Sequence, residues 1–350
     1  MRSGPPTAEL TAAGVGVRVN VARGGRALAA DVPVADVKLS ASTEQVVPQQ
    51  ISFSAPLDWV PVGALDPLNN FGQRVQVVAL VEHEAPVGIN LGWFQIDSWN
   101  EGDDAVSVKA SDLMRVLDEN PMDWPSSPAK NATLESELRR LCSIADGGGL
   151  SVVLDVDDFT IDSTLQWDTS RTTSIQDLCT SYGLEYGVKA DGRLHVWEKL
   201  TGRDPVAHYS GRDLLVGAPR SSQARRANRF IVVGSNGDSD NEKRYSSVVK
   251  ANTPPFDFSG YGVVTSRIEL SGATTQAAVT KAATAAMRDA LSVAETRTLE
   301  IVLDPRLELG DIISVLTDAG EPLVGRVTAI SADFSNVDQT MRADVEVLKW

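Results

Sequence analysis

Residues that mark catalytic and metal centres are scarce in this sequence. Among its 350 residues are two cysteines and three histidines, and the histidines (His83, His195 and His208) stand far apart. There is no H-E-x-x-H helix, no G-x-S-x-G elbow, no P-loop and no cysteine pair at zinc-binding spacing. The 47 acidic residues guarantee carboxylate pairs, so a glycosidase-type pair that cleaves peptidoglycan is not excluded, but none can be singled out. We therefore predict that the protein is not an enzyme and uses no cofactor or metal.

Long apolar runs are also missing. The stretch VQVVALV from Val75 to Val81, even with its glutamine counted, is far shorter than the roughly 18 residues that a membrane-spanning helix requires. The opening residues, MRSGPPTAELTAAG, contain no apolar h-region, so neither a membrane span nor a conventional signal peptide is expected. Cys142 and Cys179 fall on the apolar stripes of predicted helices, which indicates buried free thiols rather than a disulfide framework.

Basic residues are outnumbered, and the formal net charge is -15. This charge argues against general binding to nucleic acids, which requires a basic surface. It would suit a surface along which DNA slides without sticking. The one basic cluster, Arg220, Arg225, Arg226 and Arg229, could contact phosphate or form salt bridges between subunits, and we favour the subunit contact.

Short alternating runs predict that residues 1–118 form a first β-barrel domain of the tube type. Gly24-Gly25 lies between two such runs, a pattern typical of a hairpin. In DAVSVKASD, Val106 and Val108 face one way and Ser107 faces the other. Residues 119–130 contain three prolines and are expected to form a boundary without regular structure.

The periodicity changes after this boundary, and residues 131–205 are predicted to form a small α+β domain. A first helix ends at the glycines 147–149, and a second begins at Thr173, the expected N-cap, and stops at Gly183. Two strands then flank Asp191-Gly192, a second hairpin pattern. The predicted buried stripes are Leu134, Leu138, Leu141 and Ile144 in the first helix, and Ile175, Leu178, Cys179 and Tyr182 in the second.

Residues 206–350 return to strands and include an Ala-rich helix over 275–291. We expect them to form a second tube-type β-barrel domain. The predicted fold class is therefore α+β and mostly β, with two similar β-barrel domains flanking a small α+β domain.

One motif occurs in both barrel regions, as LDPLNNFGQRVQV from Leu65 and as LDPRLELGDIISV from Leu303. Asp followed by Pro fits the first two positions of a type I turn, and the Gly allows a positive φ where the chain enters a strand. We interpret the motif as a duplicated structural module. Its matched residues are Leu65, Asp66, Pro67, Phe71, Gly72, Val75 and Val77 in the first copy, and Leu303, Asp304, Pro305, Leu309, Gly310, Ile313 and Val315 in the second.

Three other groups of residues suggest binding. Strand alternation places Trp93, Gln95, Asp97 and Trp99 on one face, which could meet a neighbouring subunit or stack on a sugar. We favour the interface. Asp155–Asp162 and Asn236–Glu242 are rich in carboxylates, but neither has the Gly and distal Glu of an EF-hand loop, so solvated loops are favoured over calcium sites. His195 stands in an alternating strand, where a partly buried, hydrogen-bonded side chain is favoured over a metal ligand.

Three stretches resemble the baseplate hub proteins of tailed bacteriophages, a family that includes proteins called minor tail proteins. SIQDLCTSYGLEYGVKADGRLHVWE (174–198) looks like the helix and hairpin of that family. LELGDIISVLTDAGEPLVGRVTAIS (307–331) looks like its C-terminal tube domain, and LGWFQIDSWNEGDDAVSVKASDLMRVL (91–117) like its N-terminal tube domain. Together these stretches indicate the same domain order across most of the chain.

The resemblance implies a structural protein of the virion tail tip, assembled in the host cytoplasm. Hub proteins are homotrimers in which each chain supplies two similar barrels, so that six barrels match the sixfold tail tube while the trimer matches the threefold tip. The implied partners are the distal tail protein or tail tube, the tape-measure protein, and tail-tip or fibre proteins, with DNA passing through the lumen without specific binding. The alternative is a carbohydrate-binding tail module that recognises the host surface through the tryptophan face.

Overall fold

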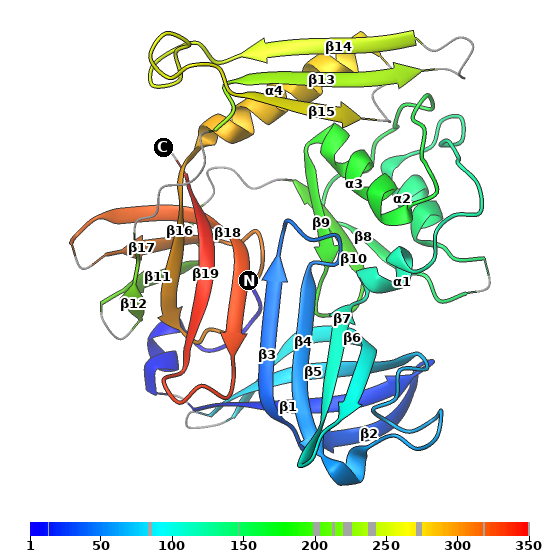
Figure 1. Cartoon of the computed structure of the whole chain (residues 1–350), viewed down its shortest axis with the longest axis vertical. Coiled ribbons are helices and arrows are strands. Elements are labelled where there is room, and N and C mark those ends of the chain that lie inside the picture. Colours follow the sequence, from blue (N-terminus) through cyan, green and yellow to red (C-terminus); the bar gives the residue numbers. More distant parts are fainter. Residues whose placement is uncertain are drawn as a thin grey trace.

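The computed structural model describes residues 1–12, 14–82, 86–145, 147–198, 204–211, 214–219, 226–236, 243–270, 275–317 and 319–348. These residues form a mostly β protein of the α+β class, which confirms the predicted fold class. Figure 1 shows a large sheet in the lower part, an α+β unit at the right, and a small sheet with a helix at the top.

The first part of the large sheet comes from the N-terminal third of the chain. Inward-facing residues such as Val75, Val77 and Ala79 are buried and alternate with less buried neighbours, as expected for strands with one face on the core. Gly24 and Gly25, both at positive φ, turn the first hairpin as predicted. The elements are η1 (Thr7–Ala12), β1 (Gly14–Arg23), β2 (Arg26–Val32), β3 (Ala35–Ser42), β4 (Gln49–Pro56), η2 (Leu57–Trp59), β5 (Gln73–Glu82), β6 (Val87–Glu101) and β7 (Ala105–Asp112).

The second part comes from the C-terminal region and continues the same sheet. β3 pairs with β4 on one side and with β18 on the other, in a register that includes Leu39 opposite Ala332. The strand order is β12-β16-β19-β18-β3-β4-β7-β6-β5-β1-β2, with β17 between β11 and β18. The elements are β11 (Ala207–Ser210), β12 (Leu215–Gly217), β16 (Val293–Val302), β17 (Ile312–Leu316), β18 (Pro322–Asp333) and β19 (Thr340–Leu348).

This continuous sheet differs from the predicted arrangement, in which two barrel domains are separated by the α+β domain. One 13-stranded sheet and one hydrophobic core contain residues of both barrel-type regions. Within the described residues, no pairing joins the end strands β2 and β12. The physical reason is that β3 and β18 would each have one unpaired edge if they stood apart. Their pairing satisfies the backbone N–H and C=O groups along both of these edges.

The α+β unit has its own core. Ile175, Leu178 and Cys179 of α3 are buried as predicted, and Gly183 ends α3 at a φ of 72°. The N-cap of α3 is Ser170 rather than Thr173, because the side chain of Ser170 accepts the hydrogen bond of the Thr173 backbone. The elements are α1 (Met114–Asp118), α2 (Leu134–Cys142), β8 (Val152–Leu154), α3 (Arg171–Tyr182), β9 (Leu184–Val188) and β10 (Leu194–Glu198).

A third unit separates β12 from β16 and was not distinguished in the sequence. β13 (Arg229–Asn236), β14 (Lys243–Lys250) and β15 (Thr265–Leu270) form a separate three-stranded sheet, and α4 (Gln276–Ser292) packs on β13 and β14. The Ala-rich helix is therefore present, but it covers this sheet instead of the second barrel region.

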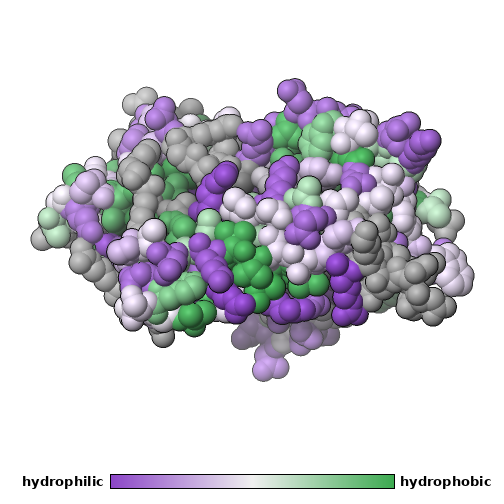
Figure 2. All heavy atoms as spheres, turned by 90° about the horizontal axis from the view of Figure 1, so that it is seen from above, coloured by the Kyte–Doolittle hydropathy of each residue, from purple (hydrophilic) through white to green (hydrophobic). Residues whose placement is uncertain are grey.

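From above, Figure 2 shows a central apolar area bordered by hydrophilic side chains.

Candidate assembly surfaces

Both copies of the duplicated motif form the predicted turn. The backbone nitrogen of Asn69 donates to the carbonyl of Asp66, and that of Leu307 donates to the carbonyl of Asp304, each at 3.2 Å. The glycines that follow have nearly equal φ values, 87° at Gly72 and 84° at Gly310. The turns lead into β5 and β17, where Val75, Val77, Ile313 and Val315 are buried. The motif therefore produces the same Asp-Pro turn and a positive-φ glycine in both copies.

The second copy is packed against other parts of the chain. The carboxylate of Asp304 is buried, accepts a hydrogen bond of 2.8 Å from the hydroxyl of Tyr209, and pairs with the guanidinium of Arg306 at 2.7 Å. Burial and the neighbouring Asp304 carboxylate raise the pKa of Tyr209. Leu303 is only 1% exposed, and Leu309 is half-buried against the main core.

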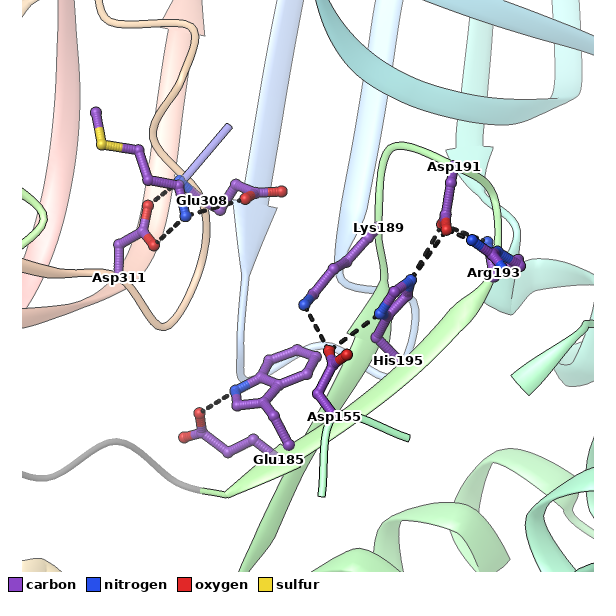
Figure 3. A network of polar contacts seen from close by, with 10 residues as sticks. Asp155, Glu185, Lys189, Asp191, Arg193, His195, Glu308 and Asp311 are labelled. Atoms are coloured by element: carbon purple, nitrogen blue, oxygen red, sulfur yellow. Dashed lines mark hydrogen bonds and ion pairs between the residues drawn. The ribbon is translucent and has the colours of Figure 1, made fainter. Parts of the chain in front are cut away.

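Residues near the N-terminus cover this second turn. The guanidinium of Arg2 donates to the carbonyls of Leu307 at 3.0 Å and Pro305 at 3.2 Å. The Arg2 backbone nitrogen also donates to the carbonyl of Arg306 at 2.8 Å, and the Arg306 side chain donates to Thr7. The nitrogen of Met1 lies beside Asp311 and Glu308 (Figure 3). The carbonyl groups of the turn are thus satisfied by another segment of the same chain.

The first copy is open to solvent. Leu65 is 64% exposed, Phe71 is 59% exposed, and Val62, just before the motif, is exposed almost completely. The carboxylate of Asp66 accepts the backbone N–H groups of Gly63 and Val62 at 2.7 Å, and these hydrogen bonds lower its pKa. The same motif therefore presents an apolar surface in one copy and a buried contact in the other.

The predicted tryptophan face is not a single face. The pairing of β6 with β7 shifts register between Ile96 and Ser98, which indicates a bulge at Asp97. Trp93 packs against the core of the α+β unit, while Trp99 packs against the core of the large sheet. The indole N–H of Trp99 donates to Asn69 at 3.2 Å.

The other two residues of the predicted face bond to neighbours. Asp97 accepts a hydrogen bond of 2.6 Å from Ser111, and the Gln95 amide donates to Glu119. The bulge reverses the alternation that placed all four residues together. The prediction of one shared face was therefore wrong, and no pair of tryptophans flanks these polar groups to stack on a sugar.

A cleft of about 1200 Å³ lies between the three units. Arg326 of β18 crosses one side of it: its guanidinium donates to Glu185 of β9 at 3.1 Å and pairs with Glu346 of β19. The other Glu185 oxygen accepts the indole N–H of Trp197 at 3.2 Å. This ion-pair chain joins the α+β unit to the large sheet. It was not predicted, although a lone arginine within the apolar run LVGRVTAI was a detectable sign of a buried pair.

A second polar network lies within the α+β unit (Figure 3). His195 is largely buried, with Nδ1 3.1 Å from Asp155 and Nε2 3.1 Å from Asp191. Burial alone would raise the pKa of Asp155, but hydrogen bonds from Lys189 and His195 outweigh it, so that pKa is lowered. The pKa of Asp191 is lowered in the same way, with Arg193 as a further hydrogen-bond donor. His195 is thus a partly buried, hydrogen-bonded side chain, as the sequence predicted.

The remaining candidate sites show no ligand geometry. In the acidic stretch Asp155–Asp162, the carboxylates bind different partners. Asp158 accepts a hydrogen bond from the backbone of Glu135, and Asp162 accepts one from the backbone of Thr164. Across the described ranges, no group of three or more His, Cys, Asp or Glu side chains is placed to hold a metal ion. His83, Arg220, Arg225 and the acidic loop 237–242 lie outside the described residues. Arg226 and Arg229 lead into β13, and His208 stands on β11 beside Ser314.

Both cysteines are buried and unpaired, as predicted. Burial raises the pKa of Cys142 to about 12 and raises that of Cys179 as well. Within the part of the chain that the structure describes, no helix is both long and apolar enough to cross a membrane.

The fold is shared with solved structures of tail proteins, two of them from prophages. No family model and no curated protein matches the sequence. Among solved structures, the tail protein from Neisseria meningitidis MC58 is similar with a TM-score of 0.67 at 16% identity, covering 96% of each chain. The 43 kDa tail protein of prophage MuSo2 from Shewanella oneidensis has a TM-score of 0.62 at 13% identity, covering 94% of this chain and 98% of that one. Prophage tail protein gp18 from Listeria monocytogenes EGD-e has a TM-score of 0.57 at 12% identity, covering 95% of each chain. At these identities the likeness establishes the fold, and it agrees with the fold that the sequence resemblance implied.

Proposed function

We propose that the chain is a non-enzymatic structural protein of a phage tail tip, where three copies form a hub between the tail tube and the tip. The observation that carries this proposal is the likeness to three tail proteins over at least 94% of the chain, so that all three units and not one domain are matched. Function is otherwise not fixed by a fold, so the assembly itself has to be tested.

The duplicated module supports the hub role. Three chains that each carry the module twice would place six similar turns around one axis, which suits a sixfold tube above and a threefold tip below. Such a ring is built from head-to-tail contacts, in which two different surfaces of each chain meet. The continuous sheet supports this arrangement too, because both modules lead into strands of that sheet.

The proposed partners follow from this position. They are the distal tail protein or tail tube on one side, tail-tip or fibre proteins on the other, and the tape-measure protein within the lumen. The net charge of -15 supports a lumen through which DNA passes without specific binding. In the virion, the protein would occupy the tail tip.

The test is the solution mass of the purified chain by light scattering, with negative-stain images of the same fraction. We expect a mass of about 112 kDa, three times the 37.4 kDa of one chain, and ring-shaped particles with a central hole. A chain that stays at 37.4 kDa at all concentrations up to about 0.1 mM contradicts self-assembly of the ring.

A further inference from the structure

The central strand of the small sheet formed by β13, β14 and β15 is apolar on both of its faces. β13 contains the run FIVV over residues 230–233. Val232 points towards α4 and is buried in one cluster with Ala283. Because side chains alternate along a strand, Ile231 and Val233 point away from α4. A strand with one solvated face normally alternates apolar with polar residues, whereas a continuous apolar run is typical of a strand that is covered on both sides.

Strand pairing makes the side chains on the uncovered side neighbours. Ile231 lies directly opposite Val248 of β14 and opposite Arg267 of β15. Two residues away along β13, Arg229 lies opposite Lys250. Residues directly opposite each other in an antiparallel pair have Cβ atoms about 4.5–5.5 Å apart. These five side chains therefore form one continuous surface at the top of Figure 1, which we call the outer face, and Val248 is 46% exposed on it.

Two positive charges of the outer face stand opposite each other. Arg229 and Lys250 form a directly opposed pair, an arrangement in which like charges are destabilising. Among the residues that the structure describes, no carboxylate pairs with either side chain. Asp257, in the loop between β14 and β15, instead accepts hydrogen bonds from Ser259 and Gly260 of the same loop. The chain thus holds two cations together without supplying their counter-charge.

The other charges near the outer face leave it basic. Glu269 of β15 pairs with Arg267 at 3.0 Å, so its charge is already used. The acidic connection that follows β13 begins after Asn236, about 23 Å along the strand from Arg229. The net charge of the whole chain is -15, and the outer face therefore differs in sign from the molecule that carries it.

The free edge of β14 is protected, which directs a partner to the face instead. The carbonyl of Ser246 accepts a hydrogen bond of 3.0 Å from the side-chain amide of Gln276. Arg244 and Lys250 are exposed towards the two ends of this strand. Charged side chains on an edge strand hinder the addition of a further strand.

We propose that the outer face docks an amphipathic helix of another protein, in which carboxylates border an apolar stripe. Three strands span about 10 Å, the diameter of one helix, and α4 covers the opposite side of the same sheet in this way. The apolar stripe covers Ile231 and Val248, and the carboxylates pair with Arg229 and Lys250 and relieve their repulsion. A nucleic acid fits less well, because none of the five side chains is aromatic and able to stack on a base.

This inference goes beyond the proposed hub and does not depend on three copies assembling. The probe is a fluorescein-labelled helical peptide of about 18 residues, with leucines along one stripe and glutamates on both sides of it. The control peptide has the same composition in an order that gives no stripe. By fluorescence anisotropy with the full chain, we expect a Kd of about 10–100 µM for the striped peptide, at least tenfold tighter than for the control, and weaker binding in added salt.

Variants locate the binding site. Lys250→Glu places a carboxylate opposite Arg229, so it should weaken binding at least tenfold and raise the urea midpoint, since a like-charge pair becomes an opposite pair. Lost binding together with higher stability cannot result from unfolding. Lys130→Glu is the matched control, because it makes the same charge change at an exposed position outside the small sheet, and the Kd should stay within about twofold. Val248→Ser should weaken binding by removing an apolar contact.

Each contrary outcome is specific. Equal Kd values for the two peptides, or no binding below about 1 mM, overturn the docking of an acidic helix. An unchanged Kd for Lys250→Glu overturns its location on the outer face. A single-stranded oligonucleotide that binds more tightly than the peptide, and is lost in Lys250→Glu, overturns the protein partner in favour of a nucleic acid. A changed mass of Lys250→Glu in light scattering overturns it in favour of a second copy. The mass of the wild-type chain tests the hub separately, because the peptide requires only one chain.

Discussion

The hydroxyl of Tyr209 donates a hydrogen bond of 2.8 Å to the carboxylate of Asp304, and both side chains are buried. Asp66 holds the same position in the first copy of the module, but it is only partly buried, and its carboxylate accepts the backbone N–H groups of Val62 and Gly63. One sequence motif thus places an aspartate in two environments of very different polarity.

Replacing these two aspartates should have unequal effects. Asp304→Ala leaves the Arg306 charge buried without its carboxylate partner and the Tyr209 hydroxyl without its acceptor, and we expect a loss of about 3–5 kcal/mol in the free energy of unfolding. Asp66→Ala removes contacts at a solvated turn and should lower that free energy much less. Urea unfolding followed by circular dichroism measures both. Equal losses would show that the buried network contributes no more than the turn itself.

Asp112 should make stability fall as pH rises towards neutrality. Burial raises its pKa to about 7, although the backbones of Met114 and Gln49 donate hydrogen bonds to it. Between about pH 4 and 7, the folded chain retains a proton that the unfolded chain has released. Stability from this group is therefore full below about pH 4 and decreases by up to about 4 kcal/mol through pH 7.

The Asp112→Asn variant tests this directly. An amide does not titrate, so the difference in unfolding free energy between wild type and variant should change steadily between pH 4.5 and 8. Parallel pH profiles over that range would mean that the carboxyl group is already ionised in the folded chain.

The cluster around His195 should act in a lower pH range and with the opposite sign. The pKa values of Asp155 and Asp191 are lowered, so the stability they contribute is present above about pH 4 and is lost as pH falls through the folded values. Both carboxylates are more than about one-third exposed, which limits the effect to about 1 kcal/mol. His195→Ala should therefore lose less stability than the wild type between pH 5 and 2.5. If wild type and variant lose the same stability over this pH range, His195 does not lower the pKa values of Asp155 and Asp191.

The two cysteines should be inert while the chain is folded. Cys142 and Cys179 are buried and their pKa values are raised, so little reactive thiolate forms near neutral pH. With Ellman's reagent at pH 8, we expect no fast reaction in buffer and two thiols per chain in urea. Rapid labelling without denaturant would indicate that the α+β unit opens locally.

Local features of the fold could be predicted because their causes are local. Gly24-Gly25 and Asp191-Gly192 turn hairpins, and Gly183 ends a helix, since each requires a positive φ that glycine adopts easily. The two Asp-Pro turns follow from the same reasoning. Strand pairing between distant segments has no such local cause, so the contact between β3 and β18 was not predicted.

The candidate surfaces depended on contacts that the sequence does not reveal. Leu65 and Leu303 both precede an Asp-Pro pair, but only the second lies beside a turn that Arg2 and Tyr209 reach from elsewhere in the chain. The bulge at Asp97 changes which side Trp99 faces, and a single extra residue in a strand leaves no clear mark in a pattern of alternation. The exposure of Val62 and Phe71 could be recognised only once the structure around them was known.

The β3–β18 contact also determines how this molecule would respond to force. Five ladder pairs, from Ala329 opposite Ser42 to Asp333 opposite Lys38, join the two ends of the sequence side by side. A pull along these strands would load the pairs in shear, so they would have to break together and not one after another. The β13–β15 unit is instead connected to the large sheet by two stretches of chain, from β12 into β13 and from α4 into β16. Under tension the large sheet would move as one plate, and any displacement would appear first at those two connections.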